Sequence, residues 1–368
     1  MRPCRMTLHT AGCLREVSVI KLPILTGEKG MKFIRAWRHY FDISWRRCNL
    51  RFKCNSATIL LRCTMFWENC LRIRFLHYYL VGCREILKFV DSDEKPMWFN
   101  SVSGRRVFAM KGAKRVAVNE TVQLSRCRFT VKTRCRYPSL PDDGKSLSVM
   151  FKAVSGKNIR KEIEEIEGIL LQFSPKGSFR NEHNIEYYEY FTPHCTDVED
   201  CELHLVDWYS CNVTDPTLDE LIEGRGHPIL RIPGCITGLV QVNDTKAHGP
   251  YSREFQNLEE RDALEALRAG APVPPCDRNT MMKRSHAAWE NLDHDSISYG
   301  FIQAGIAGNL DGTEDGALSA DVATIWQNGS MWDRRIAIEK DIKAKVENGT
   351  YKHFLKDYKK GNPSLSSA

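Results

Sequence analysis

The chain has 368 residues, of which 42% are hydrophobic and 27% charged, values that are ordinary for a globular protein. It lacks the roughly 18 consecutive apolar residues that a membrane span needs, which excludes an integral membrane protein with helical spans. The net charge of +7 is uneven, because residues 1–90 hold 17 Lys or Arg against 5 Asp or Glu and are therefore +12, which leaves −5 for the rest. A basic segment ahead of a mildly acidic body favours a polyanionic partner, most simply nucleic acid.

The first part of the chain is predicted to be basic and helical. Residues 1–30 show no periodicity and are expected to be poorly ordered, and they lack the apolar run of a signal peptide. In residues 31–85, aromatic and aliphatic side chains recur at helical spacing among Lys and Arg, which predicts two or three amphipathic helices. Six basic side chains on the outer faces are candidates for contacts with phosphates: Arg35, Arg38, Arg46, Arg47, Arg51 and Lys53.

From Ile86 onward the pattern is that of strands followed by alternating strands and helices. Ile86–Val90 is a short apolar run that ends at several acids, which predicts a buried strand delivering them at its end. Further strands are predicted at 115–118, 127–133, 146–154, 169–173, 203–207 and 228–232, and helices at 157–167, 182–191, 216–223 and 251–269. This order predicts an α/β fold with a mixed sheet, antiparallel first and parallel later, flanked by helices on both faces; the RNase H-like fold is one such arrangement.

Three aspartates stand where strands are predicted to end or just beyond. Asp93 and Asp207 each follow an apolar strand, and Asp244 opens the segment after the last strand. Two-metal phosphoryl transfer needs carboxylates from different strands, because two hard cations roughly 3.5–4 Å apart hold the attacking and leaving oxygens. The three acids are therefore candidate catalytic and metal-binding residues, with Asp91 as the alternative to Asp93. Spacing by itself is weak evidence, since any strand can end in Asp.

The blocks around these acids resemble a known family. Asp93 to Asn100 (Asp-Glu-Lys-Pro-Met-Trp-Phe-Asn) resembles the first-acid motif of DDE superfamily endonucleases of the mariner/pogo-like transposase group. Leu203 to Trp208 is similar to the second-acid strand, and Gln241 to Tyr251 is similar to the third-acid block. The resemblance covers roughly residues 86–269, about half the chain, and suggests a truncated or transposon-derived copy.

The flanks depart from the family at two acids. Trp208 follows the second aspartate where many relatives have asparagine, and Val242-Asn243 precedes the third where proline and leucine are commoner. These departures, with a shortened N-terminal region, support the alternative of a catalytically inactive, transposase-derived DNA-binding protein. A structural protein without a nucleic-acid role is a third reading, which the basic first segment disfavours.

What the resemblance implies is a DNA-binding transposase that cleaves phosphodiester bonds and transfers strands with two Mg²⁺ or Mn²⁺ ions. Asp93 and Asp207 would share one ion and Asp244 would hold the other. The implied partner is double-stranded DNA and the implied assembly a homodimer, because two DNA ends have to be joined. The implied organisation is an N-terminus at 1–30, a basic, possibly remnant DNA-binding segment at 31–85, a catalytic core at 86–270, a helical extension at 271–354 and a disordered tail at 355–368.

Two further features concern a histidine and the cysteines. His248 lies four residues after Asp244, so on a helix it would face the same way, where it could contact the scissile phosphate or serve as a structural histidine. The 14 cysteines include no CxxC pair, which favours reduced thiols in an intracellular protein that is not secreted, and nuclear if the organism is eukaryotic.

Overall fold

The computed structural model describes residues 56–80, 87–99, 128–141, 146–154, 156–157, 159–195, 200–208, 216–271 and 277–350. The N-terminal segment 1–30, the strand expected at 115–118 and the tail expected at 355–368 lie outside these ranges. Among the described residues, no helix combines the length and apolar character that crossing a membrane demands.

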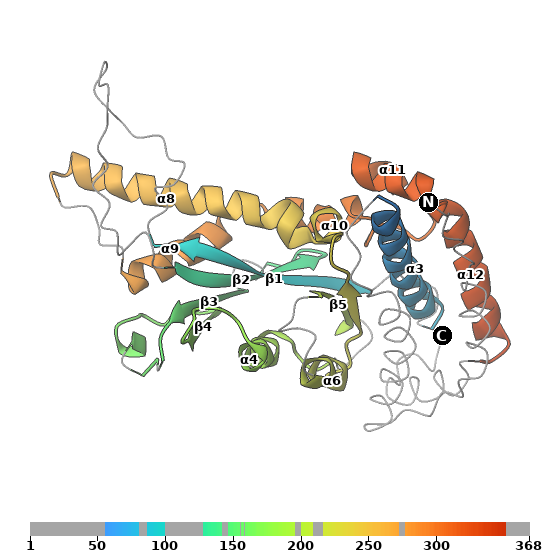
Figure 1. Ribbon diagram of the computed structural model, residues 1–368, viewed down its shortest axis with the longest axis horizontal. Helices are drawn as coiled ribbons and strands as arrows, with labels where there is room; N and C mark the ends of the chain where they lie inside the picture. The colour runs from blue at the N-terminus through green and yellow to red at the C-terminus, as the bar shows by residue number, and fades with distance from the viewer. Residues whose placement is uncertain are drawn as a thin grey trace, which may run out of the picture.

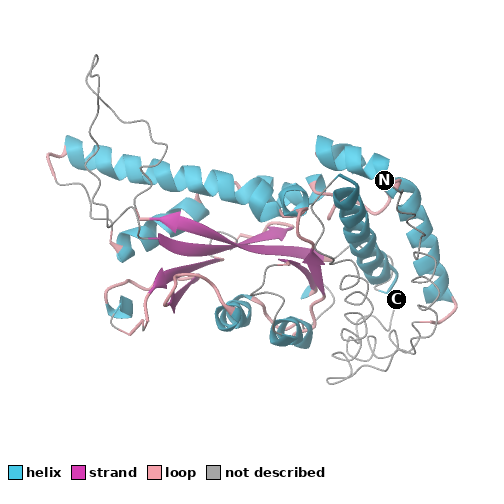
Figure 2. Cartoon of the chain, in the orientation of Figure 1, coloured by secondary structure: helices cyan, strands magenta, loops and turns pink. Residues whose placement is uncertain are grey.

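The centre of the fold is a six-stranded mixed sheet with the order β4-β3-β2-β1-β5-β6. Figure 2 shows the sheet in magenta between cyan helices. The strands are β1 (Lys88–Trp98), β2 (Arg128–Tyr137), β3 (Leu147–Lys152), β4 (Ile169–Ser174), β5 (Glu202–Asp207) and β6 (Ile229–Ile232). The first three pair antiparallel, whereas β5 runs parallel to β1 and β6 parallel to β5. This is the RNase H-like arrangement predicted from the element order, with β4 added at the edge, parallel to β3.

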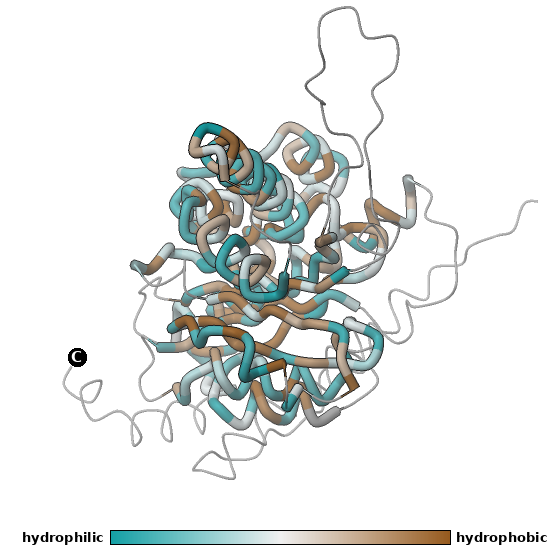
Figure 3. Tube along the Cα trace, turned by 90° about the vertical axis from the view of Figure 1, so that its left-hand side faces the viewer, coloured by the Kyte–Doolittle hydropathy of each residue, from teal (hydrophilic) through white to brown (hydrophobic). Residues whose placement is uncertain are grey.

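Helices cover both faces of the sheet (Figure 1). On one side lie α4 (Asn181–Phe191) and α6 (Pro216–Gly224). On the other lie α7 (Thr237–Val240), η6 (Asn243–Ala247), α8 (His248–Arg268), α9 (Arg278–Glu290) and α10 (His294–Gln303), after which η7 (Asp315–Ala317), α11 (Ala320–Asn328) and α12 (Met331–Glu347) follow. Figure 3 shows the hydrophobic segments of the strands between the two helical layers.

The alternation of side chains along the strands assigns each residue to one face. Phe89, Leu203 and Leu205 belong to the large core shared with α8, α9 and α10. Val206, one residue further along β5, belongs instead to a smaller core formed with α4 and α6. Because side chains two apart share a face, Asp91 and Asp93 lie on the side of α8, as does Asp207.

The described part of the basic segment, residues 56–80, forms one helix, and the rest of the region in which two or three helices are predicted lies outside the described residues. Helix α3 (Ser56–Leu80) has 25 residues, and its buried side chains, among them Phe66 and Trp67, join the large core. Trp67 donates its indole N–H to the carbonyl oxygen of Ala304 at 2.9 Å. Figure 1 shows α3 beside α12, so helices from the two ends of the described chain pack together.

The helix expected at 157–167 is not present. Only the short 3-10 turn η4 (Ile159–Lys161) forms there, and the chain continues without helix to β4. Ile163 is buried and Ile159 and Ile166 pack against the large core from this irregular path. Helix propensity is a weak preference, and here tertiary packing overrides it.

The cysteines are not all reduced thiols. Cys235 is disulfide-bonded, whereas Cys63, Cys70, Cys135, Cys195 and Cys201 form no disulfide. The expectation of reduced thiols is therefore wrong at Cys235, because disulfide formation depends on a close spatial approach that sequence spacing does not reveal.

Candidate metal centre

The pairing of β1 with β5 places Asp93 and Asp207 at corresponding positions along neighbouring strands. Asp91 is in register with Leu205 in this parallel pair, and Asp93 and Asp207 each lie two residues further along. Asp93 does not end its strand as expected. It lies inside β1, opposite Thr133, because β2 pairs with β1 along nearly its whole length.

The third acid and the histidine come from the start of the long helix. Asp244 lies in η6, a π-helical turn of five residues, and His248 begins α8 directly after it. Nδ1 of His248 lies 3.5 Å from Oδ1 of Asp244 and 3.8 Å from Oδ2 of Asp93. One ligand atom from each of the three residues lies within 4.8 Å of the others, a spacing that could hold a metal ion. Single π-helical turns occur often at functional sites.

Burial and neighbouring carboxylates both act on the pKa of Asp93. Burial, followed by the charges of Glu94, Asp91, Asp207 and Asp244, raises the pKa of Asp93 to about 9. Asp207 is thus close enough to act on Asp93, although it is not one of the three residues within 4.8 Å. A divalent cation would relieve the repulsion, so this oxygen-rich set fits the metal that the family resemblance implies.

A lysine lies beside these acids. Lys95 follows Asp93 on the same face of β1, where burial lowers its pKa and the charges of Asp244 and Asp93 raise it. It places one cation at the edge of the acidic cluster, a suitable position for contact with a phosphate.

Asp91 and Asp93 have different environments. Asp91 is fully buried, and its Oδ2 accepts hydrogen bonds from the backbone N–H of Asn243 at 2.7 Å and from its Nδ2 at 2.9 Å. Nδ2 of Asn243 also donates to the backbone oxygen of Asp91 at 2.9 Å. Asp91 therefore ties the π-helical turn to β1, while Asp93 faces Asp244 and His248.

Sequence patterns did not reveal two members of this site. Thr133 and Asn243 are fully buried, and the hydroxyl group of Thr133 lies between Oδ1 of Asn243, at 2.6 Å, and Nε2 of His248, at 3.2 Å. A polar residue at an inward position of the alternating β2 pattern was the one available signal for Thr133.

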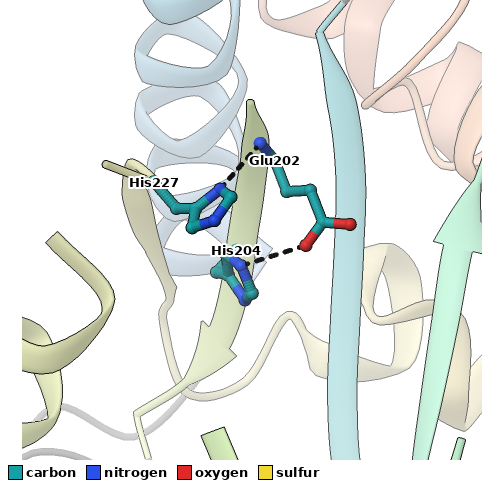
Figure 4. A group of neighbouring side chains, drawn as sticks. All are labelled: Glu202, His204 and His227. Atoms are coloured by element: carbon teal, nitrogen blue, oxygen red, sulfur yellow. Dashed lines mark hydrogen bonds and ion pairs between the residues drawn. The ribbon is translucent and has the colours of Figure 1, made fainter. Parts of the chain in front are cut away.

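A second group of ligand-type side chains lies on the opposite face of the sheet. Glu202, His204 and His227 bring one ligand atom each within 4.8 Å of the others (Figure 4). Nδ1 of His227 accepts from the backbone N–H of Glu202 at 3.1 Å, and its Nε2 lies 2.8 Å from the carbonyl oxygen of Pro193. This histidine is already hydrogen-bonded at both ring nitrogens.

The carboxylate of this second group is also engaged. Glu202 accepts from Arg134 at 2.6 Å and from Arg136, and these charges hold its pKa well below the usual range although burial opposes them. Two guanidinium groups on the one carboxylate disfavour a bound cation. The second group is therefore a buried structural network that connects β5 to β2.

This network predicts a pH dependence of stability. Burial lowers the pKa of His204 to about 4 from 6.5, so below pH 6.5 the unfolded chain takes up a proton that the folded chain resists. Above pH 6.5 this histidine does not lower the free energy of unfolding. As the pH drops toward 4, the free energy of unfolding falls by on the order of 3 kcal/mol. Urea unfolding at pH 7 and pH 4 is expected to show this extra loss in the wild type and not in His204→Leu. An equal loss in both proteins would contradict it, and His194→Gln, at an exposed position, is the control.

The predicted DNA-contacting residues Arg35, Arg38, Arg46, Arg47, Arg51 and Lys53 lie outside the described residues. Three other basic residues of the same segment are described and contact the body of the protein. Arg62 donates to the carbonyl oxygen of Gly234 at 2.6 Å, Arg72 pairs with Asp341 at 3.1 Å, and Arg74 donates to the carbonyl oxygen of Gly308. Part of the positive charge of this segment therefore takes part in hydrogen bonds and an ion pair within the folded protein.

No family model matches the sequence, and no curated protein matches it. Among solved structures, the chain is similar to the Mos1 transposase paired-end complex with left transposon end, at 10% identity and a TM-score of 0.38, over 88% of this chain and 80% of that chain. At this identity and TM-score the likeness supports no inference about activity or site residues, and the fold assignment rests on the strand order.

Proposed function

We propose that the protein is a DNA-binding endonuclease of the DDE transposase type, which cleaves phosphodiester bonds and transfers DNA strands with divalent metal ions. The observation that carries this proposal is the placement of Asp93, Asp207 and Asp244 on one face of an RNase H-like sheet, where Asp93 and Asp244 also share a histidine. The donor set is mainly carboxylate oxygen, the ligand type that Mg²⁺ and Mn²⁺ prefer.

The roles of the residues follow from their positions. Asp93 and Asp207, level on neighbouring strands, would hold one ion, and Asp244, on the turn above them, would complete the second. When bound, the ions would activate water or a 3′-hydroxyl group and stabilise the leaving oxygen. Lys95, beside Asp93, would bind a phosphate oxygen and orient the scissile group.

Double-stranded DNA is the expected partner because residues 1–90 carry a charge of +12. A homodimer is expected because strand transfer joins two DNA ends, and a eukaryotic copy would act in the nucleus.

The proposal is tested by incubating the full chain with end-labelled duplex DNA, with and without Mg²⁺ or Mn²⁺. We expect metal-dependent nicking by the wild type and none by Asp207→Ala, while both bind DNA with an affinity that falls steeply with salt. The exposed Asp333 provides the matched control, Asp333→Ala.

Three results would contradict the proposed function in different ways. Nicking by Asp207→Ala at the wild-type rate would remove Asp207 from the site. Salt-sensitive binding without cleavage by the wild type would favour the inactive, transposase-derived DNA-binding protein. If the wild type neither binds nor cleaves DNA, a role in DNA chemistry is excluded.

A further inference from the structure

The hydrogen bonds behind the acidic cluster determine where each proton lies. Nδ2 of Asn243 faces two acceptors, the backbone oxygen and Oδ2 of Asp91, at 2.9 Å each. That side of the amide must therefore be the NH₂ group. Oδ1 of Asn243 is consequently the atom that faces Thr133 at 2.6 Å and Cys135 at 3.2 Å, and it accepts from both.

The orientation of Asn243 assigns the proton on the histidine ring. The hydroxyl group of Thr133 has one hydrogen, which it donates to Oδ1 of Asn243. Toward Nε2 of His248, 3.2 Å away, it can only accept, so Nε2 must carry a proton. In the neutral ring, Nδ1 is then an unprotonated nitrogen with a free lone pair.

This lone pair points into the acidic cluster. Nδ1 lies 3.5 Å from Oδ1 of Asp244 and 3.8 Å from Oδ2 of Asp93, so three atoms that can each ligate a cation face one another. His248 is only 6% exposed, whereas the side chain of Asp244 is 41% exposed, so the cluster faces solvent on the side of Asp244. A divalent cation between the three atoms would displace any proton held there, and a ring N–H held by a hydrogen bond is the usual state of a histidine that ligates a metal.

We propose that Nδ1 of His248 is a ligand of the second ion, the one that Asp244 holds and that Asp93 would also contact, and that Asp91, Asn243 and Thr133 position its ring. This proposal rests on the proposed function and deepens it, because a nitrogen ligand changes which ion the site prefers. Mn²⁺ accepts imidazole more readily than Mg²⁺ does, so the centre takes Mn²⁺ in preference to Mg²⁺.

The direct test is pulsed electron paramagnetic resonance of Mn²⁺ bound to the full wild-type chain, with no DNA present. We expect electron spin echo modulation from one directly coordinated imidazole nitrogen. His248→Gln is expected to lose this modulation and to bind Mn²⁺ about 10- to 100-fold more weakly, while its Mg²⁺ affinity changes by less than about threefold. His194→Gln, at an exposed position, is the matched control and should behave as the wild type does.

The positioning role of Thr133 is tested with the same measurements. Thr133→Ser keeps the hydroxyl group and is expected to retain wild-type Mn²⁺ affinity, whereas Thr133→Val removes it and should weaken Mn²⁺ binding about 10-fold. A merely structural role would change stability in both variants without this split in affinity.

The outcomes separate this proposal from the proposed function. If the wild-type protein binds Mn²⁺ without nitrogen modulation, His248 is not a ligand, and a proton instead lies between His248 and the two aspartates. That result would leave the proposed carboxylate centre in place. Wild-type protein that binds neither Mn²⁺ nor Mg²⁺ would overturn both. Because the spectrum is recorded on the wild type, the answer does not depend on whether a variant folds.

Discussion

Replacement of Asp93 by asparagine is expected to lower the rate of metal-dependent DNA nicking by roughly 100- to 1000-fold. The carboxylate faces Asp244 and His248 from the middle of β1, and under the proposed function its negative charge holds the metal. The fold should survive, because burial and the neighbouring acids raise the pKa of Asp93 to about 9, and asparagine resembles the neutral form. Single-turnover nicking assays with Mn²⁺, together with thermal unfolding, measure the two effects.

The comparison with Asp91 makes this prediction specific. Asp91→Asn is expected mainly to reduce stability, because Oδ2 of Asp91, whose pKa burial raises to about 7, accepts two hydrogen bonds from Asn243 that the substituted amide oxygen accepts less strongly. Asp333→Asn, at an exposed position, should alter neither property. Normal nicking by Asp93→Asn, with loss of nicking in a stable Asp91→Asn, would assign the first acid to Asp91 instead.

The largest loss of stability is expected on the other face of the sheet, for Lys132→Met. The side chain of Lys132 is fully buried, and its ammonium group contacts Oε1 of Glu94 at 2.6 Å and Oδ1 of Asn184 at 2.8 Å. It also lies 4.9 Å from the ring centre of Tyr187 and 5.3 Å from that of Tyr188. Without the ammonium group, the partly buried carboxylate of Glu94 loses its ion pair and the buried Asn184 loses one hydrogen bond, so the free energy of unfolding should fall by about 3–5 kcal/mol.

A double-mutant cycle tests whether the lost partner is the cause. Urea unfolding should show that Lys132→Met combined with Glu94→Gln recovers part of the loss, because the second change removes the unpaired charge. A loss below about 1 kcal/mol in Lys132→Met would show that water or rearranged side chains replace the ammonium group.

Most of the sheet was predictable because its strands carry strong local signals. The apolar runs of β5 and β6 appear in the sequence at nearly the observed bounds, and α8 shows the apolar spacing of a surface helix. The alternation of β2 marks its start, but the strand continues to Tyr137, four residues beyond the predicted end. Strand β1 was harder to delimit, since six of its residues from Asp91 to Pro96 are polar or proline and only pairing with β2 keeps them in the sheet.

Local sequence patterns were sufficient to predict the fold class and to single out Asp93, Asp207 and Asp244, because strand periodicity and the position of acids after apolar runs are local properties. Whether these acids form an active metal centre stays a prediction. Tertiary structure alone decided that Asp91 binds Asn243 while Asp93 faces Asp244 and His248. Two acids on one face of a strand have the same local pattern, and their different roles arise from the π-helical turn that packs over them. The state of the His248 ring depends in the same way on a chain of donors and acceptors from three separate elements, which no local pattern records.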